Sequence, residues 1–188
     1  MPALWRCFPW DALAAPGAPY SAAYVAPGQT VGRFDLHDDP PVRYLAETPD
    51  HAIGEILAPF RGTRFRSAYL RLVGRPLALT QVTISDSIAT RVVDCTSPSV
   101  LAQHHLRPDE LAHHDRVHTQ AIARQLHDDE RTSGLRWWST LTGAWHSVVL
   151  FTDRESPEDV TFGAPQPLDA ANDHVIDALE LLGIRRRP

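Results

Sequence analysis

Lysine is absent from this sequence: all 18 residues that carry a permanent positive charge are arginine, against 23 aspartate and glutamate residues. The absence excludes Schiff-base chemistry, a phosphate-binding loop built on lysine, and a serine–lysine catalytic pair. Cysteine is scarce too, and Cys7 and Cys95 are too few for a disulfide framework or a cysteine-based zinc site. The net charge of −5 predicts no direct binding of nucleic acid, because nucleic-acid-binding domains are usually basic.

The sequence also lacks an apolar run long enough to cross a membrane. Its first ten residues do not combine a basic start with an apolar stretch, so they do not resemble a secretory signal peptide. We therefore expect a cytoplasmic protein without a membrane partner. A chain of 188 residues, 43% hydrophobic and 22% charged, is expected to form one domain with an ordinary core. The sequence leaves the oligomeric state open, a homodimer included.

Strand and helix patterns are mixed without regular alternation, which favours an α+β domain with a mixed β core and helices packed around it. Strands are expected at 4–8, 42–47, 67–73, 77–84, 90–95, 135–138, 146–151 and 160–162. Helices are expected to begin at 48–49, to fill most of 99–129, and to close the chain over 172–182.

The helix that begins at Thr48-Pro49 has the clearest start, because Thr is a good N-cap and Pro suits the first helical position. Its core-facing residues recur at helical spacing: Ile53, Ile56, Leu57 and Phe60. Glu55 lies roughly opposite them, among mostly small or apolar neighbours: His51, Ala52, Ala58 and Pro59. We expect another part of the chain to cover this face and the Glu55 carboxylate to point into a crevice.

Three sequence pieces occur in a fixed order: Gly32-Arg33-Phe34, then Tyr44-Leu-Ala-Glu-Thr48 with Glu55 on the following helix, then Gly134-Leu-Arg-Trp-Trp-Ser139. Together they resemble the RES domain family, named for its arginine, glutamate and serine. The resemblance implies a fold related to that of ADP-ribosyltransferase toxins. It also implies NAD degradation, typically as the toxin of a bacterial toxin–antitoxin pair. It covers about residues 5–151, so we expect a single domain over 1–188 with a C-terminal strand and helix over 160–183.

The resemblance places Arg33, Tyr44, Glu55 and Ser139 at an NAD site. Cleavage of NAD builds positive charge on the ribose as nicotinamide leaves, so a carboxylate and a grip on the pyrophosphate are needed. Arg33 would bind phosphate, Tyr44 would pack on the nicotinamide or ribose, Glu55 would stabilise the cation, and Ser139 would orient the substrate or the nucleophile. Taken alone, each has a commoner role: surface arginine, half-buried strand aromatic, solvated glutamate and strand-end serine.

For the reaction, the resemblance implies phosphorolysis, with inorganic phosphate as co-substrate and nicotinamide and ADP-ribose 1″-phosphate as products. The chain would then be an NAD phosphorylase, a transferase; with water as acceptor it would be an NAD glycohydrolase. No metal or prosthetic group is required, and a helix-turn-helix antitoxin is the expected protein partner. Two features depart from the family pattern: Phe34 where many members have tyrosine, and Trp137-Trp138 where a Tyr-Pro pair is frequent.

Two other hypotheses stay open. Five histidines lie close together between positions 104 and 118: His104, His105, His113, His114 and His118. His114 and His118 are four apart, a spacing that binds zinc on one helix face, although the metalloprotease signature H-E-x-x-H is absent. This cluster would make the chain a metal-dependent hydrolase. Alternatively, the chain is a non-catalytic interaction protein.

Overall fold

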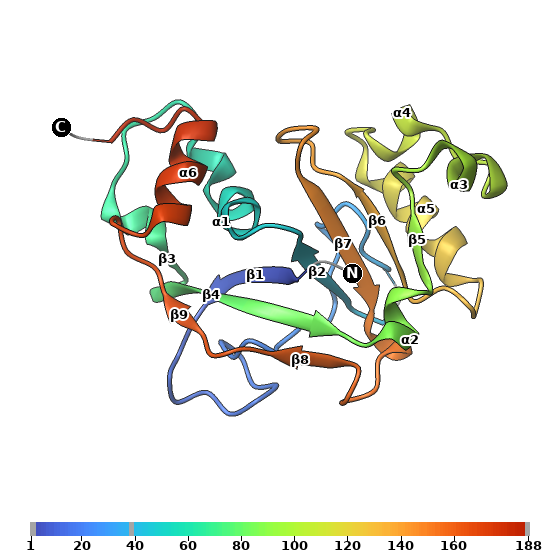
Figure 1. Ribbon diagram of the computed structural model, residues 1–188, viewed down its shortest axis with the longest axis horizontal. Helices are drawn as coiled ribbons and strands as arrows, with labels where there is room; N and C mark the ends of the chain where they lie inside the picture. The colour runs from blue at the N-terminus through green and yellow to red at the C-terminus, as the bar shows by residue number, and fades with distance from the viewer. Residues whose placement is uncertain (1–2, 38–39, 187–188) are drawn as a thin grey trace. The chain divides into compact units, whose positions relative to one another are not determined.

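The computed structural model describes residues 3–37 and 40–186 (Figure 1). They form two compact units, each assembled from separate stretches of the chain. The first unit holds 25–37, 40–45 and 84–161, and the second holds 3–24, 46–83 and 162–186. The expectation of one domain over 1–188 stays a prediction, and residues 1–2, 38–39 and 187–188 lie outside the described residues.

In the first unit, strands lie in the order β2 (Val42–Ala46, through Leu45), β7 (His146–Phe151), β6 (Gly134–Trp138) and β5 (Val92–Asp94). β6 is antiparallel to β7, with Gly134 opposite Leu150, and parallel to β5, so this part of the sheet is mixed. The helices are α2 (Asp86–Ala89), α3 (Pro98–Gln103), α4 (Pro108–Leu111) and α5 (Arg116–His127), and a 3-10 turn covers Thr152–Arg154.

The core of the first unit joins the sheet to these helices. Phe34, from the loop before β2, is fully buried and meets Trp137 of β6 edge to face at 4.5 Å between ring centroids. Leu111, Ile122 and Leu126 are buried in the same hydrophobic cluster. The cluster therefore fixes the start of the loop that carries Arg33.

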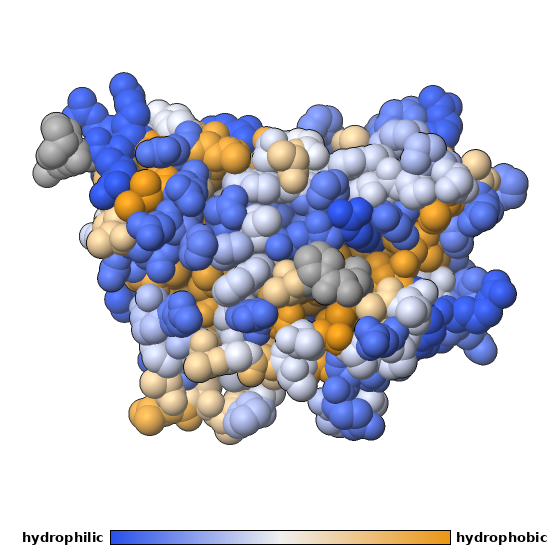
Figure 2. All heavy atoms as spheres, in the orientation of Figure 1, coloured by the Kyte–Doolittle hydropathy of each residue, from blue (hydrophilic) through white to orange (hydrophobic). Residues whose placement is uncertain are grey.

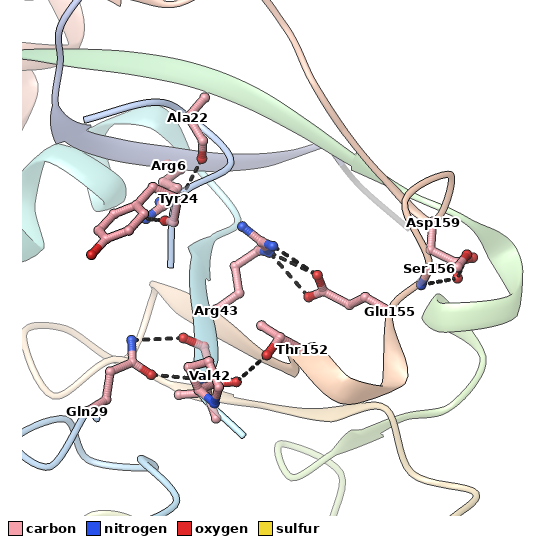
Figure 3. A network of polar contacts seen from close by, with 11 residues as sticks. Arg6, Ala22, Tyr24, Gln29, Val42, Arg43, Thr152, Glu155, Ser156 and Asp159 are labelled. Carbon is pink, nitrogen blue, oxygen red and sulfur yellow. Dashed lines mark hydrogen bonds and ion pairs between the residues drawn. The ribbon is translucent and has the colours of Figure 1, made fainter. Parts of the chain in front are cut away.

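β2 is also tied to the segment that follows β7. Arg43 and Glu155, each 8% exposed, form an ion pair with Nη2 and Oε2 2.9 Å apart (Figure 3). Thr152 donates its hydroxyl to the Pro41 carbonyl at 2.7 Å. A buried ion pair stabilises only when it is well hydrogen-bonded, and this guanidinium meets both carboxylate oxygens.

In the second unit, β1 (Leu4–Pro9) is antiparallel to β4 (Arg75–Ile84, through Thr83), which also pairs with β3 (Arg71–Leu72) and β9 (Gln166–Pro167). β8 (Val160–Phe162) is the strand in which the chain passes from the first unit to the second. Helix α1 (Pro49–Leu57) packs on β1 and on α6 (Asp173–Leu181), and 3-10 turns cover Ala58–Phe60 and Ser67–Leu70.

The α+β class with a mixed sheet is confirmed, and most expected strands are present. The expected strand at 67–73 is wrong: Ser67–Leu70 is a 3-10 turn and only Arg71–Leu72 is strand. The reason is tertiary, because the ring of Tyr69 stacks on that of Phe60 at 3.8 Å. The expected helical stretch at 99–129 is divided into three helices. No helix in the described ranges is long and apolar enough to cross a membrane.

Candidate functional site

A buried carboxylate organises the loop that leads into β2. Asp35 is 2% exposed, and its Oδ1 accepts a hydrogen bond from the Tyr44 hydroxyl at 2.8 Å. Its Oδ2 accepts from the Gly32 backbone N–H at 2.6 Å. The Phe34 N–H in turn donates to the Tyr44 oxygen at 2.9 Å. These bonds fix the Gly32-Arg33-Phe34 turn against β2 without any regular secondary structure.

Two glutamine side chains hold the rest of the loop. The Gln29 amide exchanges two hydrogen bonds with the backbone of Val42, at 2.7 and 3.1 Å, as a neighbouring strand would (Figure 3). Gln120 of α5, 4% exposed, donates to the carbonyls of Thr30 and Gly32 at 3.0 and 2.9 Å. Residues 29–35 are therefore anchored to both β2 and α5.

A shallow cavity of about 390 Å³, largely open to solvent, lies at the surface of the first unit and is lined by residues 26–32, Asp35 and Tyr44. Gly32 lines this cavity, and no larger residue fits at its position. A Cβ added at Gly32 would lie 2.3 Å from Asp35 Oδ1 and 2.5 Å from the Tyr44 oxygen. The cavity has the size of a small-ligand pocket, and most of its lining residues belong to the loop before β2.

Tyr44 combines a fixed hydroxyl with a ring that lines the cavity. Burial raises the pKa of Tyr44 well above its ordinary value, and the nearby Asp35 carboxylate raises it further. The phenol therefore stays protonated, and its O–H donates a hydrogen bond to the Asp35 carboxylate. This geometry favours packing of the Tyr44 ring on a ligand over donation from its hydroxyl.

Arg33 is half-buried and points towards the turn between α4 and α5. Its Nη1 donates to the His113 carbonyl at 2.5 Å and lies 3.4 Å from that of Leu111. The Thr119 hydroxyl donates to the Arg33 carbonyl. Arg33 therefore has a structural role in the first unit, and any contact with phosphate would be made from this anchored position.

Ser139 follows β6 directly and is 6% exposed. Its N–H donates to the Trp145 carbonyl at 2.8 Å, and its Oγ accepts from the Leu141 N–H at 3.1 Å. Earlier on the same strand, Trp137 lies 6.3 Å from the Tyr44 ring, edge to face. The Gly134–Ser139 segment is thus connected by packing to Tyr44 of β2 and to Phe34, the neighbour of Arg33.

Glu55 belongs to the second unit, on α1. Its side chain is 47% exposed, and its Oε1 lies 3.0 Å from Nε2 of His51, which is completely buried one turn earlier. His51 and Ala52 are buried, as expected for a covered face, but Glu55 and Pro59 are exposed. The expected apolar stripe ends early, because the α-helix stops at Leu57. The meeting of Glu55 with Arg33, Tyr44 and Ser139 around NAD stays a prediction.

The histidines between positions 104 and 118 do not gather into a ligand set. The rings of His113 and His118 lie 5.1 Å apart, but His114 precedes α5 and does not share a helix face with His118. Across residues 3–37 and 40–186, no three or more His, Cys, Asp or Glu side chains are placed to hold a metal ion. The metal-dependent hydrolase hypothesis therefore has no supporting geometry in the described residues.

Asp35, Gln29 and Gln120 are the site residues that the sequence reasoning missed. One signal was present for Asp35: it stands between Phe34 and Leu36, and an acid between two core residues indicates a buried, hydrogen-bonded carboxylate. No comparable signal marks the glutamines, because Gln29 bonds a residue 13 positions away and Gln120 bonds one 90 positions away.

A sequence model described as RES domain matches residues 3–170. A search of curated proteins gives no match. Among solved structures, the chain is similar to a chain in the crystal structure of the M. tuberculosis MbcT-MbcA toxin–antitoxin complex, with a TM-score of 0.63 and 18% sequence identity. The alignment covers 96% of this chain and 88% of that one, which shows a shared fold.

Proposed function

The chain belongs to the RES domain family, and on that premise we propose that it degrades NAD by cleaving the nicotinamide–ribose bond. The observation that carries the proposal is the Gly32-Arg33-Phe34 turn, which three hydrogen bonds of Asp35 and Tyr44 hold beside an open cavity of about 390 Å³. A largely pre-formed pocket is the usual setting for binding of a small molecule. We assign the family's arginine, glutamate and serine to Arg33, Glu55 and Ser139 on the resemblance of the motifs that contain them.

The proposed chemistry follows from the substrate. The glycosidic bond to nicotinamide breaks, its electron pair goes to the positively charged ring nitrogen, and neutral nicotinamide leaves without needing a proton. Glu55 would stabilise the positive charge that develops on the ribose. Arg33 would contact the pyrophosphate, Tyr44 would pack on the ribose or nicotinamide, and Ser139 would help to orient the reactants. Holding these groups in one geometry removes much of the entropic barrier.

Inorganic phosphate is the proposed acceptor. One of its oxygens forms a bond to the ribose carbon as the bond to nicotinamide breaks, which gives ADP-ribose 1″-phosphate. The chain would then be an NAD phosphorylase that uses NAD and phosphate as substrates, without a prosthetic group or metal. Water in the same position would give ADP-ribose instead.

The proposal extends to a biological role as a toxin. One similar solved structure is of a toxin–antitoxin complex, which supports an antitoxin as the protein partner of this chain. A helix-turn-helix antitoxin and action in the cytoplasm are further parts of the same proposal. An enzyme that destroys a shared cofactor needs such an inhibitor to be tolerated by its host.

Product analysis tests the enzymatic part. The purified chain is incubated with NAD, with and without phosphate, and nicotinamide, ADP-ribose and ADP-ribose 1″-phosphate are separated and quantified. We expect nicotinamide release that depends on phosphate, with ADP-ribose 1″-phosphate as the second product. Equal release without phosphate, together with ADP-ribose, would identify a glycohydrolase. Unchanged NAD in both incubations of folded chain would contradict the proposal.

A further inference from the structure

The charge of −5 is distributed unevenly along the chain. Residues 56–85 contain five arginines and no aspartate or glutamate: Arg61, Arg64, Arg66, Arg71 and Arg75. All these arginines lie in the second unit, four of them in the connection between α1 and β3 or in β3 itself. A chain that is acidic overall therefore carries one strongly basic segment.

Arg185 and Arg186, which follow α6, lie close to this segment. The backbones of Arg64 and Arg185 form a parallel bridge, in which Phe65 N–H donates to the Arg185 carbonyl at 2.9 Å and Arg185 N–H donates to Thr63 at 3.0 Å. Figure 1 shows the chain after α1 running next to residues 182–186, which follow α6. We call Arg64, Arg66, Arg185 and Arg186 the arginine surface. All four are exposed.

The side chains of the arginine surface have no acidic partner among the described residues. Elsewhere, ion pairs with carboxylates engage Arg43, Arg75, Arg107, Arg131, Arg136 and Arg154. Within residues 3–37 and 40–186, no hydrogen bond or ion pair involves the side chains of the arginine surface. The exposed carboxylates of Asp177 and Glu180 on neighbouring α6 do not pair with them either. Like charges held together without counter-charges repel, and an anionic ligand would relieve that repulsion.

Aromatic rings lie in the same segment. Phe60 and Tyr69 are stacked, with centroids 3.8 Å apart and planes 5° apart, and Phe65 meets Tyr69 edge to face at 6.2 Å. All three residues are partly exposed. Figure 2 shows hydrophilic side chains over much of the end where the C-terminus lies, with smaller hydrophobic areas between them. A ring that keeps an exposed face can stack on a base, while a nearby guanidinium bonds the phosphate.

From this combination we propose that the arginine surface binds single-stranded nucleic acid, with its guanidinium groups on the phosphates and the aromatic cluster beside the bases. An acidic protein segment could form ion pairs with the arginines, but it would not supply groups that stack on the partly exposed aromatic rings. The expectation of no nucleic-acid binding was drawn from the charge of the whole chain, and it does not take account of this local concentration. The inference is independent of NAD cleavage.

Fluorescence anisotropy of labelled RNA and DNA strands of about 20 nucleotides tests the proposal in the full chain. Four phosphate contacts predict a slope of about −3 in a plot of log affinity against log salt, so affinity should fall about fiftyfold between roughly 50 and 200 mM salt. Arg64→Gln with Arg185→Gln should weaken binding about tenfold or more and reduce the slope by about 1.4.

The matched control is Arg107→Gln with Arg131→Gln, which removes the same charge from two exposed arginines of the first unit. It should change affinity less than about twofold, because these arginines lie outside the arginine surface. A second pair, Arg66→Gln with Arg186→Gln, leaves the Arg64–Arg185 bridge unchanged and should reproduce the loss. Circular dichroism and thermal melting check that each variant is folded.

Three results would overturn the proposal. The first is failure to bind either strand at about 50 mM salt, where electrostatic binding is strong. The second is an equal loss of affinity in the Arg64→Gln, Arg185→Gln variant and in the Arg107→Gln, Arg131→Gln control. Binding would then reflect net charge alone. The third is salt-dependent binding of a polyglutamate peptide with no binding of RNA or DNA, which would assign the arginine surface to an acidic protein partner.

Discussion

The carboxylate of Asp35 lies between two donors that belong to different parts of the first unit, the Gly32 N–H of the loop and the Tyr44 hydroxyl of β2. Tyr44→Phe removes one donor and leaves a buried carboxylate oxygen without its bond, which should cost about 1–3 kcal/mol. Asp35→Asn cannot accept from both donors, because one side of the amide is itself a donor. Each single variant should therefore lower the free energy of unfolding.

The double variant shows whether the two residues act together. Tyr44 and Asp35 share one hydrogen bond. The variant with both Tyr44→Phe and Asp35→Asn should therefore lose about 1 kcal/mol less unfolding free energy than the two single variants lose together. Urea unfolding of the four proteins measures this coupling. Additivity within about 0.5 kcal/mol would mean that the Asp35–Tyr44 bond does not hold the loop.

Gly32 gives a second test at the scale of one residue. Gly32→Ala would place a methyl group 2.3 Å from Asp35 Oδ1, so the loop must move or the Asp35–Tyr44 bond must break. Overpacking of this kind costs about 1–3 kcal/mol in unfolding free energy.

Gly143→Ala is the matched control for this change, because a Cβ at Gly143 meets no atom within 4 Å. Surface changes away from special features shift stability by about 0.5 kcal/mol or less. Equal stability of the two alanine variants would show that the tight packing around Gly32 does not matter.

A residue's role could be predicted from the sequence only where that role is marked by its immediate neighbours in the chain. Arg33, Tyr44 and Ser139 could be predicted as site residues because they stand in short motifs whose order along the chain can be recognised. Gln120 could not be found in this way, because its role exists only after α5 is placed beside Thr30 and Gly32. Burial and hydrogen bonding over such separations are properties of the folded chain.

At the scale of elements, α1 was predictable and the segment after it was not. The Thr48 hydroxyl accepts from the His51 N–H at 3.3 Å, and Pro49 fills the first helical position, so the signals that start α1 lie within four residues. The segment 67–73 has the composition of a strand, but stacking of Tyr69 on Phe60 selects a 3-10 turn for Ser67–Leu70. Packing overrode local preference there.

The turn between β4 and α2 depends on a charged carboxylate. Hydrogen bonds from the Ser156 hydroxyl, and next from that of Ser85, hold the pKa of Asp159 well below its ordinary value, helped by the Ser156 N–H and the Ser87 hydroxyl. A lowered pKa stabilises the folded state above the ordinary pKa, about 4 for aspartate, and this contribution is lost as pH falls through the folded value.

Asp159→Asn should therefore be less stable than the parent near neutral pH, and the difference should shrink as the pH falls below about 4. Urea unfolding at several pH values between about 7 and 2 measures both proteins. A constant difference over the whole range would show that the charge of Asp159 contributes nothing, and that only the shape of the side chain matters.

For the whole molecule, membership of the RES domain family and the proposed NAD cleavage predict an effect on the cells that express the chain. If the chain degrades NAD as proposed, its expression without an inhibitor should lower cellular NAD and arrest growth. Glu55→Gln should relieve both effects, because the neutral amide can still accept a bond from His51 but cannot stabilise the developing charge on the ribose. The purified variant should lose at least about a hundredfold in NAD cleavage, the scale of one electrostatic contact in a transition state.

Glu180→Gln is the matched control, because it makes the same change at an exposed glutamate on α6 and should remain toxic. Both variants must accumulate as folded protein for the comparison to count. Normal growth and normal NAD during strong expression of the folded parent chain would contradict the toxin role. The enzymatic proposal then rests on the purified chain: NAD cleavage there, lost in Glu55→Gln, would keep the reaction and remove only its role as a poison. Equal cleavage by the parent and Glu55→Gln would instead remove Glu55 from the site.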